Sequence, residues 1–293
     1  MSKTESLTKQ VARYYDQIDG HYDDLYAGTV CLAEDKIVMS FVSPHLLNNS
    51  SVLDIGCGTG LVPSYLNGNP YKGVDVSSTE LQTAQEKLPH HADDFMVADM
   101  HNLPFGIESF DVVVSTYGPV SYSNDIESLK QEVLRPLRKG GEFILMPYTK
   151  RTGMGVGLGG FTTAIGGEVS RIYYKEEEIR KIFSKTEGAN VIGINYLTNF
   201  IIEKLEGKDY VPTIDESFLH EQLIYLMNRM GEGHIEFPEN INFHDLANLW
   251  QQFRRNRQNV DLMTEILQEE IKIFTGILPA HFARHMVVTG EKK

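Results

Sequence analysis

The sequence predicts an α/β protein with a doubly wound, mostly parallel sheet of seven strands. Short apolar runs of strand length alternate with amphipathic helical segments between residues 52 and 146. The run Phe110–Ser115 is apolar enough to be buried on both faces, as strands of a parallel sheet are. The stretch Val52–Gly60 opens this region as an apolar strand that runs into three alternating glycines, where the backbone turns tightly and approaches a ligand.

The periodicity predicts each element in turn. An N-terminal amphipathic helix is expected over residues 6–19, and a second helical pattern ends before Pro44. After the glycines, a short helix contains Pro63, and a capping box of Ser77 and Glu80 opens another helix. Further helices are expected over residues 125–137 and 176–184. The remaining strands are expected over residues 71–76, 95–99, 110–115, 142–146, 189–197 and 284–290.

A helical insertion is expected before the last strand. Residues 1–198 and 284–293 are expected to form the ligand-binding domain with an N-terminal helical lid, and residues 199–283 an inserted substrate cap. Helical patterns cover residues 216–230, 244–255 and 261–274 of that insertion. A glycine-rich stretch over residues 152–167 is either a mobile cover over a substrate or a poorly ordered connection.

The composition of the chain limits which binding partners and which cellular compartment are expected. No segment has the roughly 18 uninterrupted apolar residues that span a bilayer, and the N-terminus lacks the pattern of a secretory signal. The two cysteines offer neither a disulfide framework nor metal-ligand spacing, so we expect a cytoplasmic protein without a metal site. A net charge of -13 opposes nucleic acid as a partner. A small-molecule substrate and a monomer or homodimer are expected.

The chain resembles the class I S-adenosylmethionine-dependent methyltransferases over roughly residues 10–200 and the last strand. Val52–Gly60 is similar to the first motif of that family, which has a Rossmann-like fold. Further motifs of the family follow in the same order at Gly73–Ser77, Ala98–Phe105, Ser109–Val113 and Leu134–Gly141. The Leu103-Pro104-Phe105 sequence is typical of the small-molecule branch.

The resemblance implies a set of residues that bind S-adenosylmethionine. Asp75 and Val76 would hold the ribose, Asp99 and Met100 the adenine, and Asp54 the methionine ammonium. The glycine turn, which is Gly56, Cys57, Gly58 and Gly60, would lie against the amino-acid and sugar portions. The resemblance also implies contacts to the reactive end from Ser115, Thr116 and Tyr117, and it implies that Tyr15 or Tyr22 closes over the carboxylate of the cofactor.

Methyl transfer would leave S-adenosylhomocysteine as the product, with catalysis mainly by alignment of the reacting atoms. If the acceptor is a hydroxyl, a general base helps, and the candidates by position are Tyr117, Tyr122, His101, His220 and His244. The sequence Thr116–Tyr122 contains neither Asp-Pro-Pro-Tyr nor Asn-Pro-Pro-Tyr, which weighs against methylation of nucleic-acid bases.

Four other functions stay open at this point. The Gly-x-Gly-x-x-Gly fingerprint of nicotinamide and flavin enzymes has a glycine three places after the residue that corresponds to Gly58. This chain has Leu61 at that position. The same fold and cofactor also support non-methyl chemistry at the sulfonium, such as cyclisation or transfer of another arm. A protein methyltransferase and a non-catalytic cofactor-binding interaction protein are the remaining alternatives.

Overall fold

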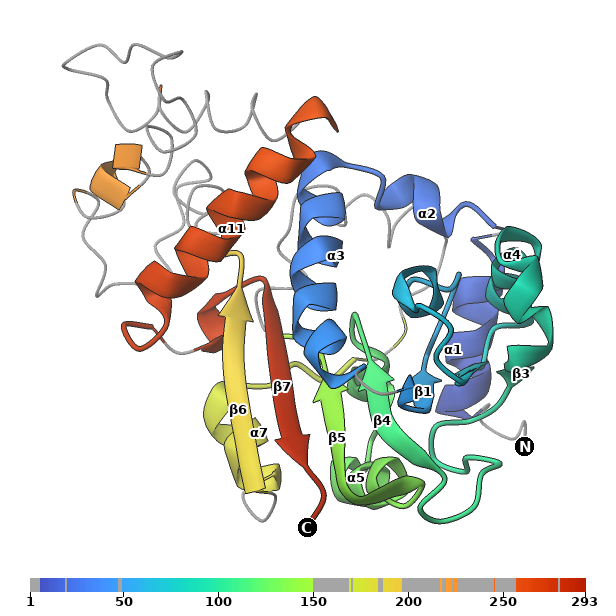
Figure 1. The fold of residues 1–293 in the computed structure, drawn as a ribbon. Helices are drawn as coiled ribbons and strands as arrows, with labels where there is room; N and C mark the ends of the chain where they lie inside the picture. The colour runs from blue at the N-terminus through green and yellow to red at the C-terminus, as the bar shows by residue number, and fades with distance from the viewer. Residues whose placement is uncertain are drawn as a thin grey trace, which may run out of the picture.

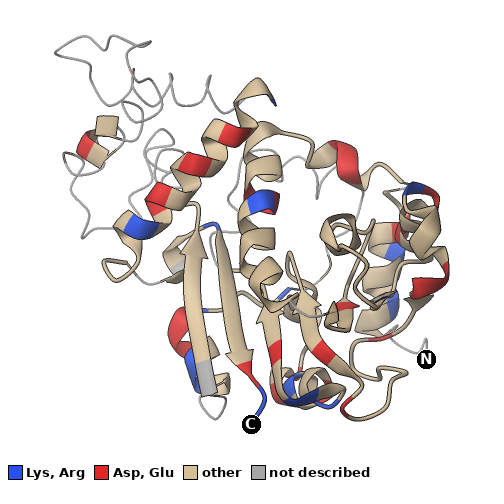
Figure 2. Ribbon diagram, viewed as in Figure 1, with Lys and Arg blue, Asp and Glu red and all other residues tan. Residues whose placement is uncertain are grey.

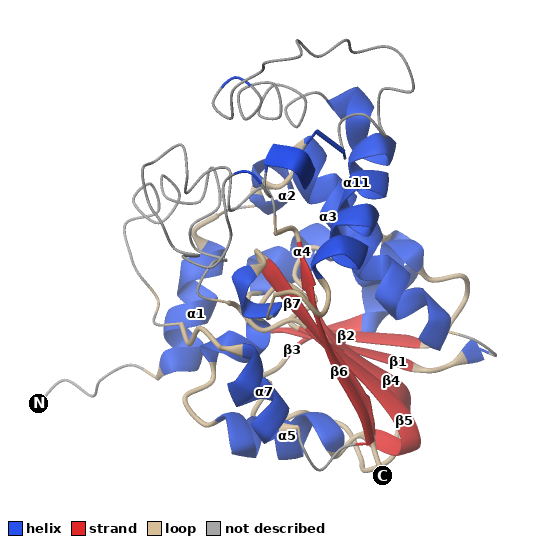
Figure 3. Ribbon diagram, turned by 90° about the vertical axis from the view of Figure 1, so that its left-hand side faces the viewer, coloured by secondary structure: helices blue, strands red, loops and turns tan. Residues whose placement is uncertain are grey.

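A seven-stranded sheet with helices on both faces forms the body of the protein (Figures 1 and 3). The computed structural model describes residues 6–18, 20–46, 49–149, 169, 171–183, 187–196, 217, 220–222, 224–225, 245, 257–278 and 280–293. The strand order is β3-β2-β1-β4-β5-β7-β6. The strands are β1 (Val52–Ile55), β2 (Tyr71–Asp75), β3 (Phe95–Val97), β4 (Phe110–Ser115), β5 (Leu137–Leu145), β6 (Glu187–Ile194) and β7 (His285–Glu291).

The direction of the strands decides which residues meet at the ligand edge. Neighbouring pairs among β1 to β5 are parallel, whereas β7 is antiparallel to both β5 and β6. β6 therefore runs in the same direction as β1 to β5. The first residue of β7, His285, lies at the edge where the other strands end. The doubly wound, mostly parallel sheet that the sequence predicts is confirmed.

Helices cover the sheet in two layers. They are α1 (Leu7–Asp16), α2 (Tyr22–Leu25), α3 (Thr29–Val42), α4 (Ser78–Lys87), α5 (Ile126–Leu134), α7 (Glu176–Ile182) and α11 (Val260–Phe274). α3 and α11 lie side by side on one face (Figure 1) and share a core with α4 through side chains such as Ile37, Leu81 and Leu267. On the other face, α5 and α7 bury Leu129 and Ile179 against the sheet.

Several element boundaries differ from the prediction. The short helix predicted after the glycines is a four-residue 3-10 helix, Val62–Tyr65. β5 begins at Leu137 because that residue pairs with Phe110, and the register then shifts around Gly140, which has φ +72°. The glycine-rich stretch and most of residues 199–256 lie outside the described residues, so the predicted domain boundaries stay a prediction. α11 confirms one helix of the insertion.

The start of α4 shows half of the predicted capping box. The Glu80 N–H donates to Ser77 Oγ over 3.1 Å. The Glu80 carboxylate does not accept the hydrogen bond from the Ser77 N–H that would complete the box. Both of its oxygens are buried without a hydrogen-bond partner among the described residues. Burial, with the nearby negative charge of Asp75, raises the pKa of Glu80 to about 8.

Glu80 should make the fold less stable as pH rises. A free glutamate titrates near pH ~4.3, so between that value and about 8 the folded state keeps a proton that the unfolded state has lost. The stability that this proton supports is complete below the lower value and is lost as pH rises toward the upper one. We expect Glu80→Gln to remove part of the fall in unfolding free energy between pH 5 and pH 8, as measured by urea denaturation.

Glu86→Gln, at an exposed position of the same helix, is the control and should leave the fall unchanged. An equal fall in the native protein and in Glu80→Gln would contradict the assignment.

Candidate active site

A cavity of about 640 Å³ lies at the carboxyl edge of the sheet. Its walls come from the tips of β1 to β4, from α1, α2 and α3, and from the first residues of β7. Most of the predicted site residues line it, namely Gly56, Cys57, Gly58, Asp75, Val76, Asp99, Met100, Thr116, Tyr15, Tyr22, Tyr117, Tyr122 and His101. The fold thus brings together residues that are more than 100 positions apart in the sequence.

The glycine turn and Asp75 form one wall of this cavity. The Gly58 N–H donates to Asp75 Oδ2 and the Ser77 N–H to Oδ1, each over 2.9 Å. A carboxylate has about four acceptor sites, so Asp75 retains capacity for two hydroxyl donors. Gly58 has φ +50°, and a Cβ added there would meet no atom within 4 Å. The turn therefore leaves open space beside an acceptor-only side chain, which fits the ribose of the expected cofactor.

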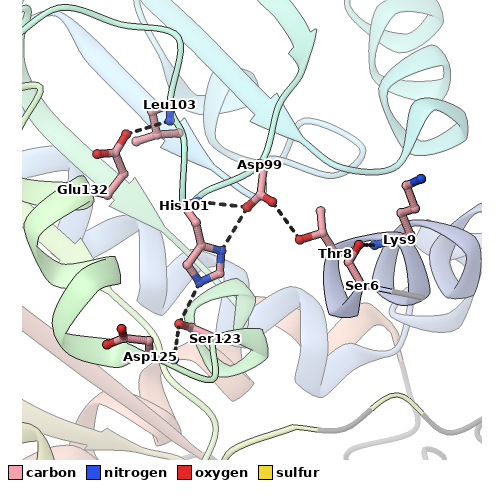
Figure 4. A network of polar contacts seen from close by, with 9 residues as sticks. All are labelled: Ser6, Thr8, Lys9, Asp99, His101, Leu103, Ser123, Asp125 and Glu132. Atoms are coloured by element: carbon pink, nitrogen blue, oxygen red, sulfur yellow. Dashed lines mark hydrogen bonds and ion pairs between the residues drawn. The ribbon is translucent and has the colours of Figure 1, made fainter. Parts of the chain in front are cut away.

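Asp99 anchors the N-terminal helix to the tip of β3 (Figure 4). Thr8 Oγ1 donates to Asp99 Oδ2 over 2.7 Å, and the His101 N–H donates to Oδ1 over 2.9 Å. The His101 ring joins the same network, with Nδ1 3.0 Å from Asp99 Oδ1 and Nε2 2.8 Å from Ser123 Oγ. Burial opposes ionisation of Asp99, but these hydrogen bonds lower its pKa. Since both ring nitrogens are engaged, His101 is not placed as a general base.

Three of the predicted site residues do not line the cavity. Asp54 is 1% exposed beneath the turn, where its Oδ2 accepts from the Tyr71 hydroxyl over 3.1 Å and burial raises its pKa to about 7. The Ser115 hydroxyl donates to the Ile55 carbonyl over 2.8 Å. A Cβ added at Gly60 would lie against the side chains of Leu88 and Phe95. None of Asp54, Ser115 and Gly60 lines the cavity, because each faces the core and supports the wall from behind.

Tyrosine rings and one arginine line the side of the cavity next to α1. The hydroxyls of Tyr15 and Tyr122 are 2.8 Å apart. The Arg171 guanidinium lies over the rings of Tyr14, Tyr122 and Tyr148, 5.6 to 5.8 Å from their centroids. Burial raises the pKa of Tyr122 well above its usual range. Tyr122 is therefore a neutral donor at physiological pH and a poor general base.

Tyr117 is also engaged elsewhere. It has φ +55°, and its hydroxyl donates to Asp35 Oδ1 over 2.5 Å. Burial raises its pKa well above the usual range, and burial also raises that of Asp35 to about 6. None of the three principal base candidates from the sequence is thus set up to accept a proton. His220 does not line the cavity, and His244 lies outside the described residues.

A buried polar cluster that sequence reasoning missed closes the far side of the cavity. Glu34 of α3 is 1% exposed, and its Oε2 lies 3.2 Å from Arg284 Nη1 and 3.4 Å from His285 Nε2. Asn195 Nδ2 donates to Glu34 Oε1 over 2.6 Å. Burial alone would raise the pKa of Glu34, but the charge of Arg284 lowers it to about 2. Glu34 is therefore an ionised carboxylate in the wall of the cavity.

Metal and membrane features are lacking in the described part of the chain. No group of three or more His, Cys, Asp or Glu side chains in it is arranged to hold a metal ion. Likewise, none of the helices within the described ranges is both long enough and apolar enough to cross a membrane.

Alanine substitutions at two glycines should separate ligand binding from folding. Both positions have positive φ, so Ala costs about 1–2 kcal/mol in either. At Gly56 the new Cβ would also lie 2.2 Å from Pro119 Cγ, whereas at Gly58 it would point into open space. We expect Gly56→Ala to lose about 1–3 kcal/mol more unfolding free energy than Gly58→Ala. Gly58→Ala should instead show the larger loss of S-adenosylhomocysteine affinity per unit of stability lost, measured by calorimetry.

The known proteins to which this chain is similar include several methyltransferases. Residues 53–145 match the family model described as "Methyltransferase domain". The chain is 28% identical over 249 residues to the ubiquinone/menaquinone biosynthesis C-methyltransferase UbiE of Campylobacter jejuni, a match covering 73% of this chain and 98% of the relative. It is 34% identical over 152 residues to the demethylmenaquinone methyltransferase of Thermotoga maritima, which covers 49% of this chain and 65% of that protein.

The solved structure of the cyclase SpnF has the same fold, with a TM-score of 0.53, 16% identity, and coverage of 97% of this chain and 96% of that one. Topology, motif order and the methyltransferase matches agree with one another. Over residues 53–145 the chain is thus similar to methyltransferases, and the strand order of its sheet agrees with that similarity.

Proposed function

We propose that this enzyme transfers the methyl group of S-adenosylmethionine to a small hydroxylated aromatic acceptor. One observation carries the proposal: a cavity of about 640 Å³ extends from the tips of β1, β2 and β3 to Tyr117, Tyr148 and His285 beyond β4 and β5. That volume falls within the ~300–1,000 Å³ range of small-molecule and cofactor sites. The cavity thus has room at the β1–β3 tips for the cofactor and at the other end for an acceptor.

The residues present fit the cofactor. Asp75 offers free acceptor capacity beside the open space at Gly58, and Asp99 and Met100 line the next part of the wall. When bound, the sulfonium supplies an activated methyl group whose carbon–sulfur bond breaks with the electron pair left on sulfur. The protein's own part is to hold the acceptor in line and to exclude water, which the lid helix α1 favours through its bond from Thr8 to Asp99.

The acceptor class is inferred from the lining and from the relatives. Side chains of Tyr14, Tyr15, Tyr22, Tyr122 and Tyr148 line the cavity, and an aromatic lining favours an aromatic ligand. Two relatives carry names of quinone-pathway methyltransferases. A hydroquinone ring is therefore the first acceptor to test.

Charge favours a small neutral or cationic partner over a polyanion. The net charge is -13, and acidic side chains outnumber basic ones along α11 (Figure 2). We infer that nucleic acid is not the substrate. We also propose that the enzyme works in the cytoplasm as a monomer or homodimer.

Removal of the Asp75 charge should weaken cofactor binding selectively. Hydrogen bonds to a charged group are worth about 1.5–3 kcal/mol, so Asp75→Asn should weaken S-adenosylhomocysteine binding by about 10- to 100-fold in isothermal titration calorimetry. Asp54→Asn changes a carboxylate that lies behind the same turn, and it should stay within about threefold of the native affinity. The opposite order, with Asp54→Asn the weaker binder, would show that the cofactor sits deeper than the cavity.

The reaction is tested with 1,4-dihydroxynaphthalene kept reduced under anaerobic conditions. We expect S-adenosylhomocysteine and a product heavier by one methyl group to form together, as detected by mass spectrometry. Release of methylthioadenosine instead would indicate non-methyl chemistry at the sulfonium. Binding of S-adenosylmethionine without turnover of hydroxylated or amine acceptors would favour a non-catalytic role, and transfer to basic peptides alone would favour a protein methyltransferase.

A further inference from the structure

We propose that His285 is the general base that takes the proton from the acceptor hydroxyl, and that Glu34 is the residue that positions its ring. This inference rests on the proposed function above. It deepens that function by specifying the substrate class, an acceptor that must lose a hydroxyl proton to become a nucleophile. Neither residue follows from the motifs of the sequence, since they lie 251 positions apart (285 minus 34).

The position of His285 places it beside the acceptor. In an open α/β sheet the ligand sits where the strand order reverses, which here is between β1 and β4. Asp75 and Asp99 follow β2 and β3 on one side of that point, and His285 opens β7 on the other side. His285 lines the same cavity as they do. A group on the β7 side therefore faces whatever lies beyond the cofactor.

The imidazole of His285 is held on two sides but is still able to act. Its Nε2 lies 3.4 Å from Glu34 Oε2, and its ring makes an edge contact with Tyr117 at 5.3 Å between centroids. The backbone of His285 also bridges to Tyr148 after β5. No hydrogen bond links Nδ1 to another residue of the described ranges. One nitrogen therefore faces a carboxylate while the other is available to a ligand in the cavity.

Glu34 has the properties of an orienting carboxylate. It is ionised and held by Arg284 and Asn195, so its oxygens are fixed before any ligand arrives. A base whose second nitrogen faces a fixed carboxylate has a defined ring orientation, and its protonated form is stabilised. By contrast, the hydroxyl of Tyr117 is already committed to Asp35, and both nitrogens of His101 are committed to Asp99 and Ser123.

With His285 as the base, every proton and electron pair of the methyl transfer is accounted for. The hydroxyl proton passes to neutral His285, the acceptor oxygen forms the bond to the methyl carbon, and the carbon–sulfur electrons stay on sulfur. If an adjacent ring carbon attacks instead, His285 first passes the hydroxyl proton to solvent, then accepts the proton that leaves that carbon and returns it to the oxygen. One proton is released to solvent from His285 in either case.

Several charged and titratable side chains line the cavity together with His285. The titratable or charged groups around it on the cavity wall are Glu34, Asp35 and Cys31 of α3, Arg284, Tyr26 after α2, Tyr117 after β4 and Tyr148 after β5. The neutral ring is the active form, and activity should therefore be lost as pH falls.

The test is the pH profile of methyl transfer to 1,4-dihydroxynaphthalene in native enzyme and in His285→Gln. The native kcat should rise with pH to a plateau. In His285→Gln we expect kcat to fall by about 10²–10⁴-fold and the acid limb to disappear. Added imidazole should partly restore turnover in His285→Ala. His90→Gln, at an exposed histidine, is the matched control and should leave rate and profile unchanged.

Cofactor affinity and folding of the same variants are measured together with their pH profiles. S-adenosylhomocysteine should bind His285→Gln within about threefold of native, because the proposal places His285 beyond the cofactor. Glu34→Asp, which keeps the charge, should retain the fold and shift the acid limb without removing it. A larger loss of affinity than of kcat in His285→Gln would make it a cofactor-binding residue and overturn the proposal.

Failure of the inference and failure of the proposed function give different results. If native enzyme methylates the acceptor and His285→Gln keeps both rate and pH profile, only the inference falls. If native enzyme binds S-adenosylhomocysteine but methylates no hydroxylated acceptor, the proposed function falls and the inference falls with it.

Discussion

The buried ion pair between Glu34 and Arg284 joins the first long helix to the last strand, and the shape of the site depends on it. Both side chains are at most 4% exposed, and removing two charges from water costs several kcal/mol per ion unless their hydrogen bonds are supplied. Asn195 supplies one, and His285 lies against the same carboxylate. Because α3, β6 and β7 all meet at this pair, the start of β7 is fixed at the edge where the parallel strands end.

That edge has two halves with different chemistry. On the β2 and β3 side, Asp75 and Asp99 present carboxylates whose partners are backbone amides, His101 and Thr8. On the β7 side, the Glu34 carboxylate is paired with Arg284, and His285 lines the cavity next to it. The first arrangement suits hydroxyl and amine donors of a cofactor, and the second suits removal of a proton. The division follows the reversal of strand order between β1 and β4.

The sequence predicts well what local periodicity and turn chemistry decide. The strands of the sheet, the helix over residues 7–16 and the glycine turn follow from apolar spacing and from residues that tolerate positive φ. Predictions that needed tertiary partners were less complete. Glu34 is a polar position in an apolar helix that no sequence motif marks as part of a site, and it is buried because Arg284 lies opposite. Asp54 has the spacing of a ligand contact but is covered by Tyr71.

One signal for His285 was present in the sequence but was not used. If the last strand is taken as antiparallel, its first residues fall at the ligand edge, which makes Arg284 and His285 site candidates. Strand direction, however, is set by pairing between distant segments, which periodicity does not report. The same reason explains the early start of β5, where Leu137 pairs with Phe110 before the shift at Gly140.

A crystal structure of the enzyme with S-adenosylhomocysteine and 1,4-dihydroxynaphthalene tests the two-sided site most directly. The account predicts ribose density at Asp75, the thioether sulfur between the tips of β1 and β4, and the naphthalene ring beyond it with a hydroxyl within hydrogen-bond distance of His285 Nδ1. Density for the naphthalene ring on the Asp99 side, or for the cofactor against Glu34 and Arg284, would contradict it.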